Sequence, residues 1–571
     1  MITTIYSVRC LFVLMIDPKF AFVKNGQFAL PFAWVYAKNM KKWTIVIVLA
    51  LTQFIMILDS SVMNVSISTV VKDLNTTVSA LQAAITFYTL TMAALMLTGG
   101  KLGDIFGRLK AFKIGAVIYA LGSLITALSP NIAVLFTGWS VIEGLGAVLV
   151  IPATAALIAV HYKGKDRVIG YTAIGAASGV AVALGPLIGG YLTTYYSWRY
   201  VFVAEVIVMI GVLIYSFRMK EPKIISKLKR ITLDLPSVFL SAGGLVLLVF
   251  GVLQSKTWGW ITPKAVPEIG NVQIAPLGIS IVAYLIVAGL IVLYFFYQRQ
   301  VTLEAENKNA LLRVSMLKVK PLRAGIAVLS GQYFITAAVF FVMPVYLQMV
   351  LGYDALQTGI RIFPLSVAII IFSAVGSRLI NKYSPKQIIR MGQIALIVGS
   401  LALTGAITPD LSGWLFGISL FILGIGLGLL VSQIGNVTMS AVDESKSSEV
   451  GGLQGTFQNF GSSLGTAVIG SIMIASLTGT FVAGINANPD INQATKNQVN
   501  ERSTAGIPIA SSQEVEQYAL QSGLPQSEAE SISTSYRTSQ IDSLRSSMFF
   551  LSIAALVMLV LSRNIPSKKV I

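Results

Sequence analysis

Fourteen runs of apolar residues, each long enough to cross a bilayer, divide this chain into hydrophobic segments and short polar connections. A spanning helix needs about 20 mainly apolar residues. Inside the hydrocarbon, only helices and closed barrels satisfy their own backbone hydrogen bonds. The runs lack the alternation of barrel strands, so they predict helices at residues 43–65, 81–99, 111–128, 132–160, 168–191, 200–217, 235–253, 274–297, 325–349, 358–380, 388–407, 413–437, 453–477 and 548–561.

The composition agrees with a membrane protein and excludes several other classes. The chain is 55% hydrophobic and 12% charged, whereas soluble domains have about 25% charged residues. Its single cysteine, Cys10, and single histidine, His161, exclude a disulfide framework and a thiolate or polyhistidine metal centre. No metal or other cofactor is expected. The net charge of +18 comes without a basic stretch of interleaved aromatics, so nucleic acid is not an expected partner.

The basic residues predict how the chain is oriented in the membrane. Lys and Arg in short loops mark the cytoplasmic side. Lys41 and Lys42 precede the first span, and further basic residues recur in every second connection after it. These connections are residues 101–113, 163–167, 218–230, 299–323 and 378–390, together with the C-terminal residues 563–569. The chain is therefore predicted to be a multi-pass protein of the cell membrane with both termini in the cytoplasm.

Two segments stand apart from this pattern. Residues 1–40 contain only a short apolar stretch, too short to span a membrane. Met40 directly precedes the basic pair Lys41 and Lys42 before the first span. We therefore predict that translation starts at Met40 and that the residues before it are a non-native or disordered extension. Residues 479–545 are polar and are predicted to be an extracellular loop. The spacing of residues 515–520 and 529–544 favours short amphipathic helices there. A solvated cap and a gate over an outer vestibule are both compatible with this loop.

A loop of unusual composition joins the second and third spans. It contains Gly100, Asp104, Gly107, Arg108 and Lys110 on the predicted cytoplasmic side. A reversal this tight needs glycine, which tolerates positive φ. Asp104 can pair with Arg108 or face the N-terminus of a helix, where negative charge is favourable. We expect this acid–base pair to hold the two halves of the protein in one conformational state.

At this loop the chain resembles the major facilitator superfamily, and specifically its fourteen-helix drug:proton antiporter branch. The loop is similar to the signature of the superfamily. Further segments are similar to motifs of the branch: residues 58–65 in the first span, Gly185, Pro186, Gly189 and Gly190 of the antiporter motif in the fifth span, residues 198–200 and residues 346–348.

The resemblance implies an all-α membrane protein with a major-facilitator-type bundle. Two six-helix halves, residues 41–218 and 323–571, would surround a central site, and residues 219–322 would carry an inserted helix pair. It also implies alternating access, a small-molecule substrate, protons as the coupling ion and function as a monomer.

The chain departs from the family pattern at positions that bear on coupling. The arginine of the family in the fourth span is Ser140 here, and the adjoining glutamine is Glu143. The asparagine of the sixth span falls on Glu205, and one glycine of the fifth span is Ala181. A coupling scheme that depends on the helix-four arginine therefore does not transfer to this chain.

Three acids fall within the predicted spans: Asp59, Glu143 and Glu205. An ionised carboxylate at mid-bilayer costs at least about 2.5 kcal/mol, and burial disfavours its charged form. Each acid is therefore a candidate for binding a proton, or a cation in exchange for it. The alternative is a structural acid, such as Asp59 bonded to Asn64. Counting from the helix ends places Glu143 near the midplane and the other two acids in the outer half.

The sequence favours export of amphipathic or cationic drugs by proton-coupled antiport. No phosphate-binding G-x-x-x-x-G-K-[ST] loop is present to support nucleotide-driven pumping. A carrier of one specific metabolite is the alternative within transport. A membrane receptor or enzyme is a remote one, because the sequence offers no signalling domain and no paired nucleophile and base. We expect a transporter, not an enzyme.

Overall fold

The computed structural model describes residues 31–219, 232–269, 272–409, 411, 414–442, 447–503 and 506–567, with side chains from Trp43 onward apart from a few positions. The described residues include 14 helices long and apolar enough to cross a membrane. Each corresponds to one predicted span. The all-α membrane fold expected from hydropathy is therefore confirmed.

The first half of the chain contains α2 (Pro31–Val65), α3 (Ile67–Asp73), α4 (Val78–Phe106), α5 (Arg108–Ala127), α6 (Ile132–Leu135), the π-helix η2 (Phe136–Glu143), α7 (Gly144–His161), α8 (Gly164–Tyr195) and α9 (Arg199–Ser216). The middle contains α10 (Leu235–Trp258), β1 (Glu268–Ile269), β2 (Val272–Gln273), the 3-10 helix η3 (Pro276–Gly278), α11 (Ile281–Ala305) and α12 (Val314–Leu317). The two strands form a small antiparallel ladder, with Ile269 opposite Val272.

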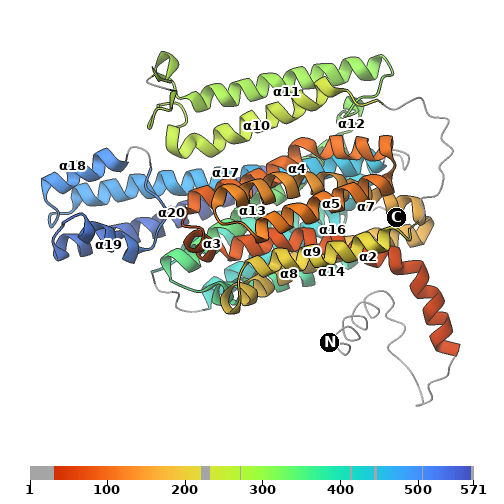
Figure 1. Cartoon of the computed structure of the whole chain (residues 1–571), viewed down its shortest axis with the longest axis horizontal. Helices are drawn as coiled ribbons and strands as arrows, with labels where there is room; N and C mark the ends of the chain where they lie inside the picture. The colour runs from red at the N-terminus through yellow and green to blue at the C-terminus, as the bar shows by residue number, and fades with distance from the viewer. Residues whose placement is uncertain are drawn as a thin grey trace.

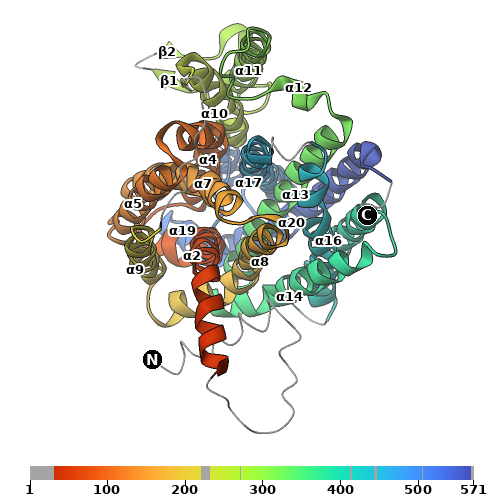
Figure 2. The ribbon, with the colours of Figure 1, turned by 90° about the vertical axis from the view of Figure 1, so that its right-hand side faces the viewer.

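The second half contains α13 (Lys320–Val345), the π-helix η4 (Tyr346–Val350), α14 (Ala355–Leu379), α15 (Pro385–Ala406), α16 (Leu415–Met439), α17 (Ser447–Ala487), α18 (Gln493–Arg502), α19 (Ser512–Gln521), α20 (Gln526–Leu561) and η7 (Ser562–Asn564). The long helices run side by side in one bundle (Figure 1). Seen end on, α10 and α11 lie together at its periphery (Figure 2).

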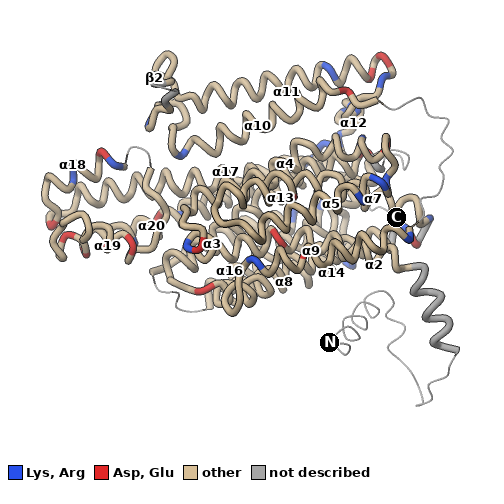
Figure 3. Tube along the Cα trace, viewed as in Figure 1, with Lys and Arg blue, Asp and Glu red and all other residues tan. Residues whose placement is uncertain are grey.

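The bundle has two distinct ends. We call the end that carries α18 and α19 the cap end, and the opposite end, where the α4–α5 connection lies, the basic end (Figure 1). Lys and Arg positions gather around α7 and α12 (Figure 3). This is the distribution that the alternating loop charges predict.

The inserted pair is held together by glycines and by one ion pair. An added Cβ at Gly244 would lie 2.7 Å from a Leu293 side-chain carbon, and one at Gly289 would lie 2.8 Å from the Leu248 nitrogen, so α10 and α11 approach closely. Arg299 of α11 donates from Nε and Nη2 to the two carboxylate oxygens of Asp234, both at 2.7 Å. This contact lowers the pKa of Asp234 to about 2, through the hydrogen bonds from Arg299.

We expect Asp234→Asn to lower the thermal stability of the protein above pH 4, because it removes a bidentate pair worth about 1 kcal/mol. A carboxyl whose folded pKa is depressed stabilises the fold above its unfolded pKa and loses that contribution as pH falls. The difference in melting temperature between the variant and the wild type should therefore shrink between pH 4 and pH 2. A difference that stays constant over this range would contradict the assignment.

Two segments differ from their sequence-based description. Helix α2 begins at Pro31, so residues 31–40 are helical rather than disordered; residues 1–30 lie outside the described part, and the start at Met40 stays a prediction. The polar segment 479–545 is largely helical instead of a loop. It extends α17 and α20 beyond the apolar runs and adds α18 and α19 between them. Residues 515–520 form part of the short helix α19, as expected, whereas residues 529–544 belong to the continuous helix α20.

The cap, as we call residues 479–545, is attached to the second half. Arg537 donates from Nη2 to the Pro409 oxygen at 2.9 Å, and Arg545 donates from Nε to the Ile407 oxygen at 3.1 Å. Inside the cap, the Glu528 carboxylate accepts from Asn492 at 2.8 Å and from Thr495 at 3.0 Å. These bonds fix the cap to the α15–α16 connection and favour a static cap over a gate.

Candidate functional site

The structure brings the three intramembrane acids together. Asp59 comes from α2, Glu143 from the end of η2 and Glu205 from α9. All three are completely buried, and one carboxylate oxygen of each lies within 4.8 Å of those of the other two. We call these three residues the acid cluster. The sequence presented them as three separate candidates, whereas the fold makes them one site.

One serine hydroxyl lies between the two glutamates. Ser123 of α5 is within hydrogen-bond distance of Glu143 Oε2, at 2.8 Å, and of Glu205 Oε2, at 3.2 Å. A hydroxyl has a single proton to donate, so it can serve only one carboxylate at a time. The other oxygens, Oε1 of Glu143 and of Glu205, are buried without a hydrogen-bond partner. Buried oxygens in native proteins normally have a partner, and a bound proton or cation would provide one here.

Aromatic side chains close the site around Asp59. The indole nitrogen of Trp139 donates to Asp59 Oδ2 at 3.0 Å, and the other carboxylate oxygen accepts from the Ser60 backbone nitrogen. Trp139 stacks on Tyr88, with ring centroids 4.8 Å apart. The Tyr119 hydroxyl is also buried and has no hydrogen-bond partner. This apolar wall keeps water away from the carboxylates in the present conformation.

Local backbone features position Glu143. It ends the π-helical segment η2, whose wider turn breaks the regular spacing of side chains along the fourth span. Opposite it, α5 carries Gly122, where an added Cβ would lie 2.4 Å from the Glu143 nitrogen. Only glycine allows so close an approach, and it brings the neighbouring Ser123 to the carboxylate. Sequence reasoning missed Ser123, Gly122 and Trp139; the small residues Gly115 and Gly122, one heptad apart on α5, were the available signal.

The acids expected at two depths meet at one point. One carboxylate oxygen of each lies within 4.8 Å of those of the other two. Counting residues from helix ends describes the backbone positions and does not include the reach of the side chains.

Asn64 and Ser140 have other roles than proton binding in this structure. The structural alternative, Asp59 bonded to Asn64, is not what the described contacts show: the Asn64 amide nitrogen donates to the Ser60 oxygen at 2.8 Å. Ser140, at the position of the family arginine, donates to the Ala84 oxygen at 2.7 Å and so joins η2 to α4. Neither residue belongs to the acid cluster.

The acid cluster has no cationic partner. Within the described ranges none of its three acids takes part in an ion pair. Two ionised carboxylates about 4.8 Å apart repel by about 3 kcal/mol even at an effective dielectric constant of 20. All three charges are therefore not present together in this conformation. The cluster can hold protons, and its oxygen ligands also suit a hard cation, although the sequence had predicted no metal site.

The α4–α5 loop has the predicted tight reversal. Gly107 has a φ of 96°, and Arg108 lies 3.8 Å from Asp104 Oδ1. Arg108 also donates from Nη1 to the Ala156 oxygen at 3.5 Å, while Lys110 is exposed and Gly100 faces Pro152. These contacts join α4, α5 and α7, all within the first half. The lock between halves that we expected here stays a prediction.

The antiporter motif on α8 forms a tight seam at the cap end. An added Cβ would lie 2.3 Å from Ser61 Cβ at Gly185 and 2.9 Å from the Val62 Cα at Gly189, both on α2. At Gly190 it would lie 2.5 Å from the Ala355 oxygen of α14. The glycine of α14 is matched in the same way: a Cβ at Gly359 would lie 2.4 Å from the Pro186 oxygen. The motif thus packs α8 against both halves of the protein.

Polar contacts join the two halves at the same end. Gln348 of η4 donates to the Val65 oxygen at 2.6 Å and accepts from the Ser68 nitrogen at 3.0 Å. In the middle of α8, no atom from elsewhere in the described structure lies within 4 Å of an added Cβ at Gly175 or Gly179. At the basic end, Tyr171 donates to the Ala155 oxygen at 3.1 Å, so α8 contacts its neighbours at both ends and has room around its middle.

A buried lysine joins a second seam, between α4 and α17. Gln82 donates to the Thr466 oxygen at 2.8 Å, and its own oxygen accepts from Lys256 Nζ at 2.9 Å. Lys256 is 7% exposed. The predicted seventh span ended at residue 253 and so excluded this residue. Through Lys256 the inserted pair is anchored where the two halves meet.

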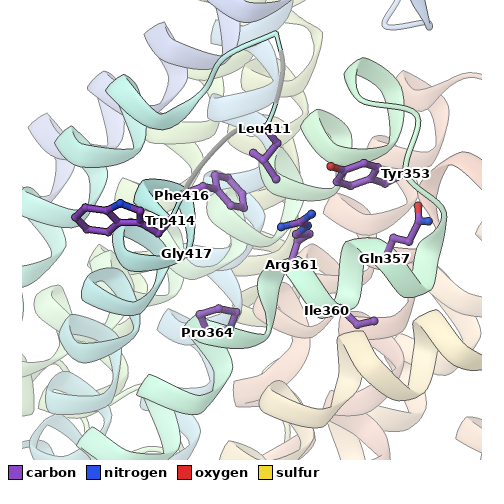
Figure 4. Close-up of a pocket in the computed structure, with 9 residues that line it drawn as sticks. All are labelled: Tyr353, Gln357, Ile360, Arg361, Pro364, Leu411, Trp414, Phe416 and Gly417. Atoms are coloured by element: carbon purple, nitrogen blue, oxygen red, sulfur yellow. The ribbon is translucent and has the colours of Figure 1, made fainter.

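The described surface has a hollow of about 440 Å³ away from the acid cluster. It lies at the cap end between α14 and the start of α16, where Arg361 points toward Tyr353 and Phe416 (Figure 4). The guanidinium lies 5.6 Å from the centroid of the Tyr353 ring. None of the residues that line this hollow is an acid.

A bundle of fourteen membrane-length helices, with buried acids in one half and glycine seams between the halves, defines a multi-pass membrane transporter. The family model of the Major Facilitator Superfamily matches residues 49–466. The chain belongs to this superfamily, as its motifs had led us to predict.

Similar proteins agree with this assignment. The chain is 25% identical over 457 residues to a probable actinorhodin transporter of Streptomyces coelicolor, with 78% of this chain and 75% of that protein covered. It is 26% identical over 462 residues to the multidrug resistance protein Stp of Mycobacterium tuberculosis, with 80% of each covered. A bacterial homolog of the human lysosomal transporter Spinster, in an inward-facing unoccupied conformation, has the same fold, with a TM-score of 0.55 at 14% identity over 92% of this chain and 97% of that one.

Proposed function

We propose that this chain is a secondary active transporter of the cell membrane that exports drug-like amphipathic or cationic molecules in exchange for protons. The acid cluster is the observation that carries the proposal: three completely buried carboxylates, each with an oxygen within 4.8 Å of the others, and no ion pair to any of them among the described residues. Such a cluster must change its proton content when water or a cationic cargo reaches it. One chain supplies the whole pathway, with both termini in the cytoplasm.

The cargo class is supported by two lines of reasoning. Relatives over about four fifths of the chain carry the names of a probable actinorhodin transporter and of a multidrug resistance protein. A cluster of acids without bases also favours a positively charged cargo, because cargo and protons then compete for the same carboxylates. This competition is the simplest form of antiport.

The seams explain how exchange stays coupled. Gly190 against Ala355 and Gly359 against Pro186 close the cap end, so in the proposed cycle the cluster exchanges protons with the basic end while these contacts hold. Opening the cap end and closing the basic end would expose the same carboxylates to the outside. Each proton that enters from the outside and leaves to the cytoplasm releases about 2.3 kcal/mol of free energy for every 100 mV of membrane potential, in addition to the contribution of the pH gradient.

Inverted membrane vesicles provide the test. A fluorescent cationic dye should accumulate when the vesicle interior is made acidic, and its addition should raise the interior pH. In parallel, a sodium gradient is imposed at constant pH. Accumulation driven by the sodium gradient alone would replace protons by sodium as the coupling ion, and accumulation without any gradient would overturn antiport. Competition by a panel of unrelated drugs would separate a broad exporter from a carrier dedicated to one metabolite.

A further inference from the structure

A second hollow opens on the lipid-facing surface at the basic end. It has a volume of about 420 Å³ and is lined by Arg390 and Ile394 of α15, Leu559 and Val560 of α20, and Arg563 of η7. We call it the basic groove. It is independent of the acid cluster and of the proposed function.

The walls of the basic groove are fixed to each other. Gln393 donates from Nε2 to the Met558 oxygen at 3.0 Å, which ties α15 to α20 beneath the groove. Lys386 donates from Nζ to the Arg563 oxygen at 2.6 Å and closes its end. The apolar lining is nevertheless open to the surroundings, with Ile394 52% and Val560 59% exposed. The groove is thus preformed and accessible.

The groove combines positive charge with an apolar floor. Neither segment that forms it contains an acid: the sequence has no Asp or Glu between Asp354 and Asp410, and none after Asp542. Within the described residues, neither Arg390 nor Arg563 takes part in an ion pair. Both arginines are exposed near the ends of their helices. Along their helices, Ile394 and Val560 lie about one turn farther from the basic end than the two arginines.

We propose that the basic groove binds an anionic phospholipid of the leaflet at the basic end. The phosphate would lie between the two guanidinium groups, which favour bidentate contacts to phosphate oxygens. An acyl chain would cover Ile394, Leu559 and Val560. Basic pockets between helices at a membrane surface are suited to such headgroups. A free anion would satisfy the arginines but leave this apolar floor uncovered.

Native mass spectrometry of the purified full-length protein tests the proposal. The protein is incubated with phosphatidylglycerol or with phosphatidylcholine of the same acyl chains. We expect selective retention of phosphatidylglycerol, weakened on the order of thirtyfold in the double variant Arg390→Gln, Arg563→Gln. The double variant Lys318→Gln, Lys320→Gln loses the same charge at exposed positions of the basic end and should bind like the wild type.

A second variant keeps the test decisive if the arginine variant folds poorly. Ile394→Trp fills the groove and leaves both arginines in place, so it should also lose the lipid. Inorganic phosphate at millimolar concentration should not displace the lipid; displacement would show a simple anion site. Equal retention of both lipids, or equal loss in the lysine control, would overturn the proposal.

Discussion

Replacing Glu143 by glutamine is expected to abolish export driven by a proton gradient. Glutamine keeps the shape of the side chain but cannot take up or release a proton. Glu143 shares Ser123 with Glu205 and has a buried oxygen without a partner, so we expect coupling to depend on the proton that it binds. We expect a decrease of more than roughly tenfold in the initial rate of dye accumulation, a change of about 1.4 kcal/mol in the barrier.

A chemically matched control is available in the cap. Glu528→Gln removes another buried carboxylate but lies outside the acid cluster, so it should leave coupling unchanged. Exchange of labelled for unlabelled cargo in the absence of a gradient should survive in Glu143→Gln, which would show that the protein still folds and binds cargo. If dye accumulation in Glu143→Gln still follows the pH gradient, Glu143 is not part of the coupling site. The same result with all three acids neutralised would eliminate the cluster.

Gly190→Ala is expected to prevent closure at the cap end. The new Cβ would lie 2.5 Å from the Ala355 oxygen and 2.9 Å from the Leu356 Cα. Both atoms belong to the backbone and cannot rotate away. Overpacking of this kind costs about 1–3 kcal/mol. Because the clash exists only when the seam is closed, that cost shifts the equilibrium toward a cap-open state, and export should decrease severalfold or more.

Thiol labelling measures this shift directly. Cys10 is the only cysteine of the chain, so a Cys10→Ser background allows a single reporter, Thr193→Cys, which is 6% exposed at the seam. Labelling by a membrane-impermeant reagent should become faster in Gly190→Ala. The control Gly179→Ala, on the same helix with no atom within 4 Å of its added Cβ, should label like the reporter alone. Equal labelling in the two glycine variants would mean that the seam does not govern closure.

The sequence alone was sufficient for the helices and their number. A bilayer demands about 20 apolar residues in each span, so this information is local and can be read in any one segment. At the ends of the spans, where the bilayer no longer requires apolar residues, the prediction of helix bounds became weaker. The eighth span, expected at residues 274–297, is Ile281–Ala305, and the polar first half of α20 was not recognised as part of a continuous helix, because water imposes no hydrophobic pattern there.

The motifs could also be recognised in the sequence, but only some of their structural roles could be predicted from it. The positive φ of Gly107 follows from the requirement of a tight reversal, which is a property of one residue. That Gly190 meets the Ala355 backbone, and that Arg108 contacts α7, depends on which helices become neighbours. Spacing along one helix does not contain this information.

What the sequence determined, then, is that three acids are buried in the membrane without nearby bases. Only the tertiary structure decided that they form one cluster, since residues 59, 143 and 205 meet through the close approach of α5 at Gly122 and the π-helical turn before Glu143. The physical reason is that burial follows from the hydropathy of each segment, whereas the distance between side chains of different helices is set by packing.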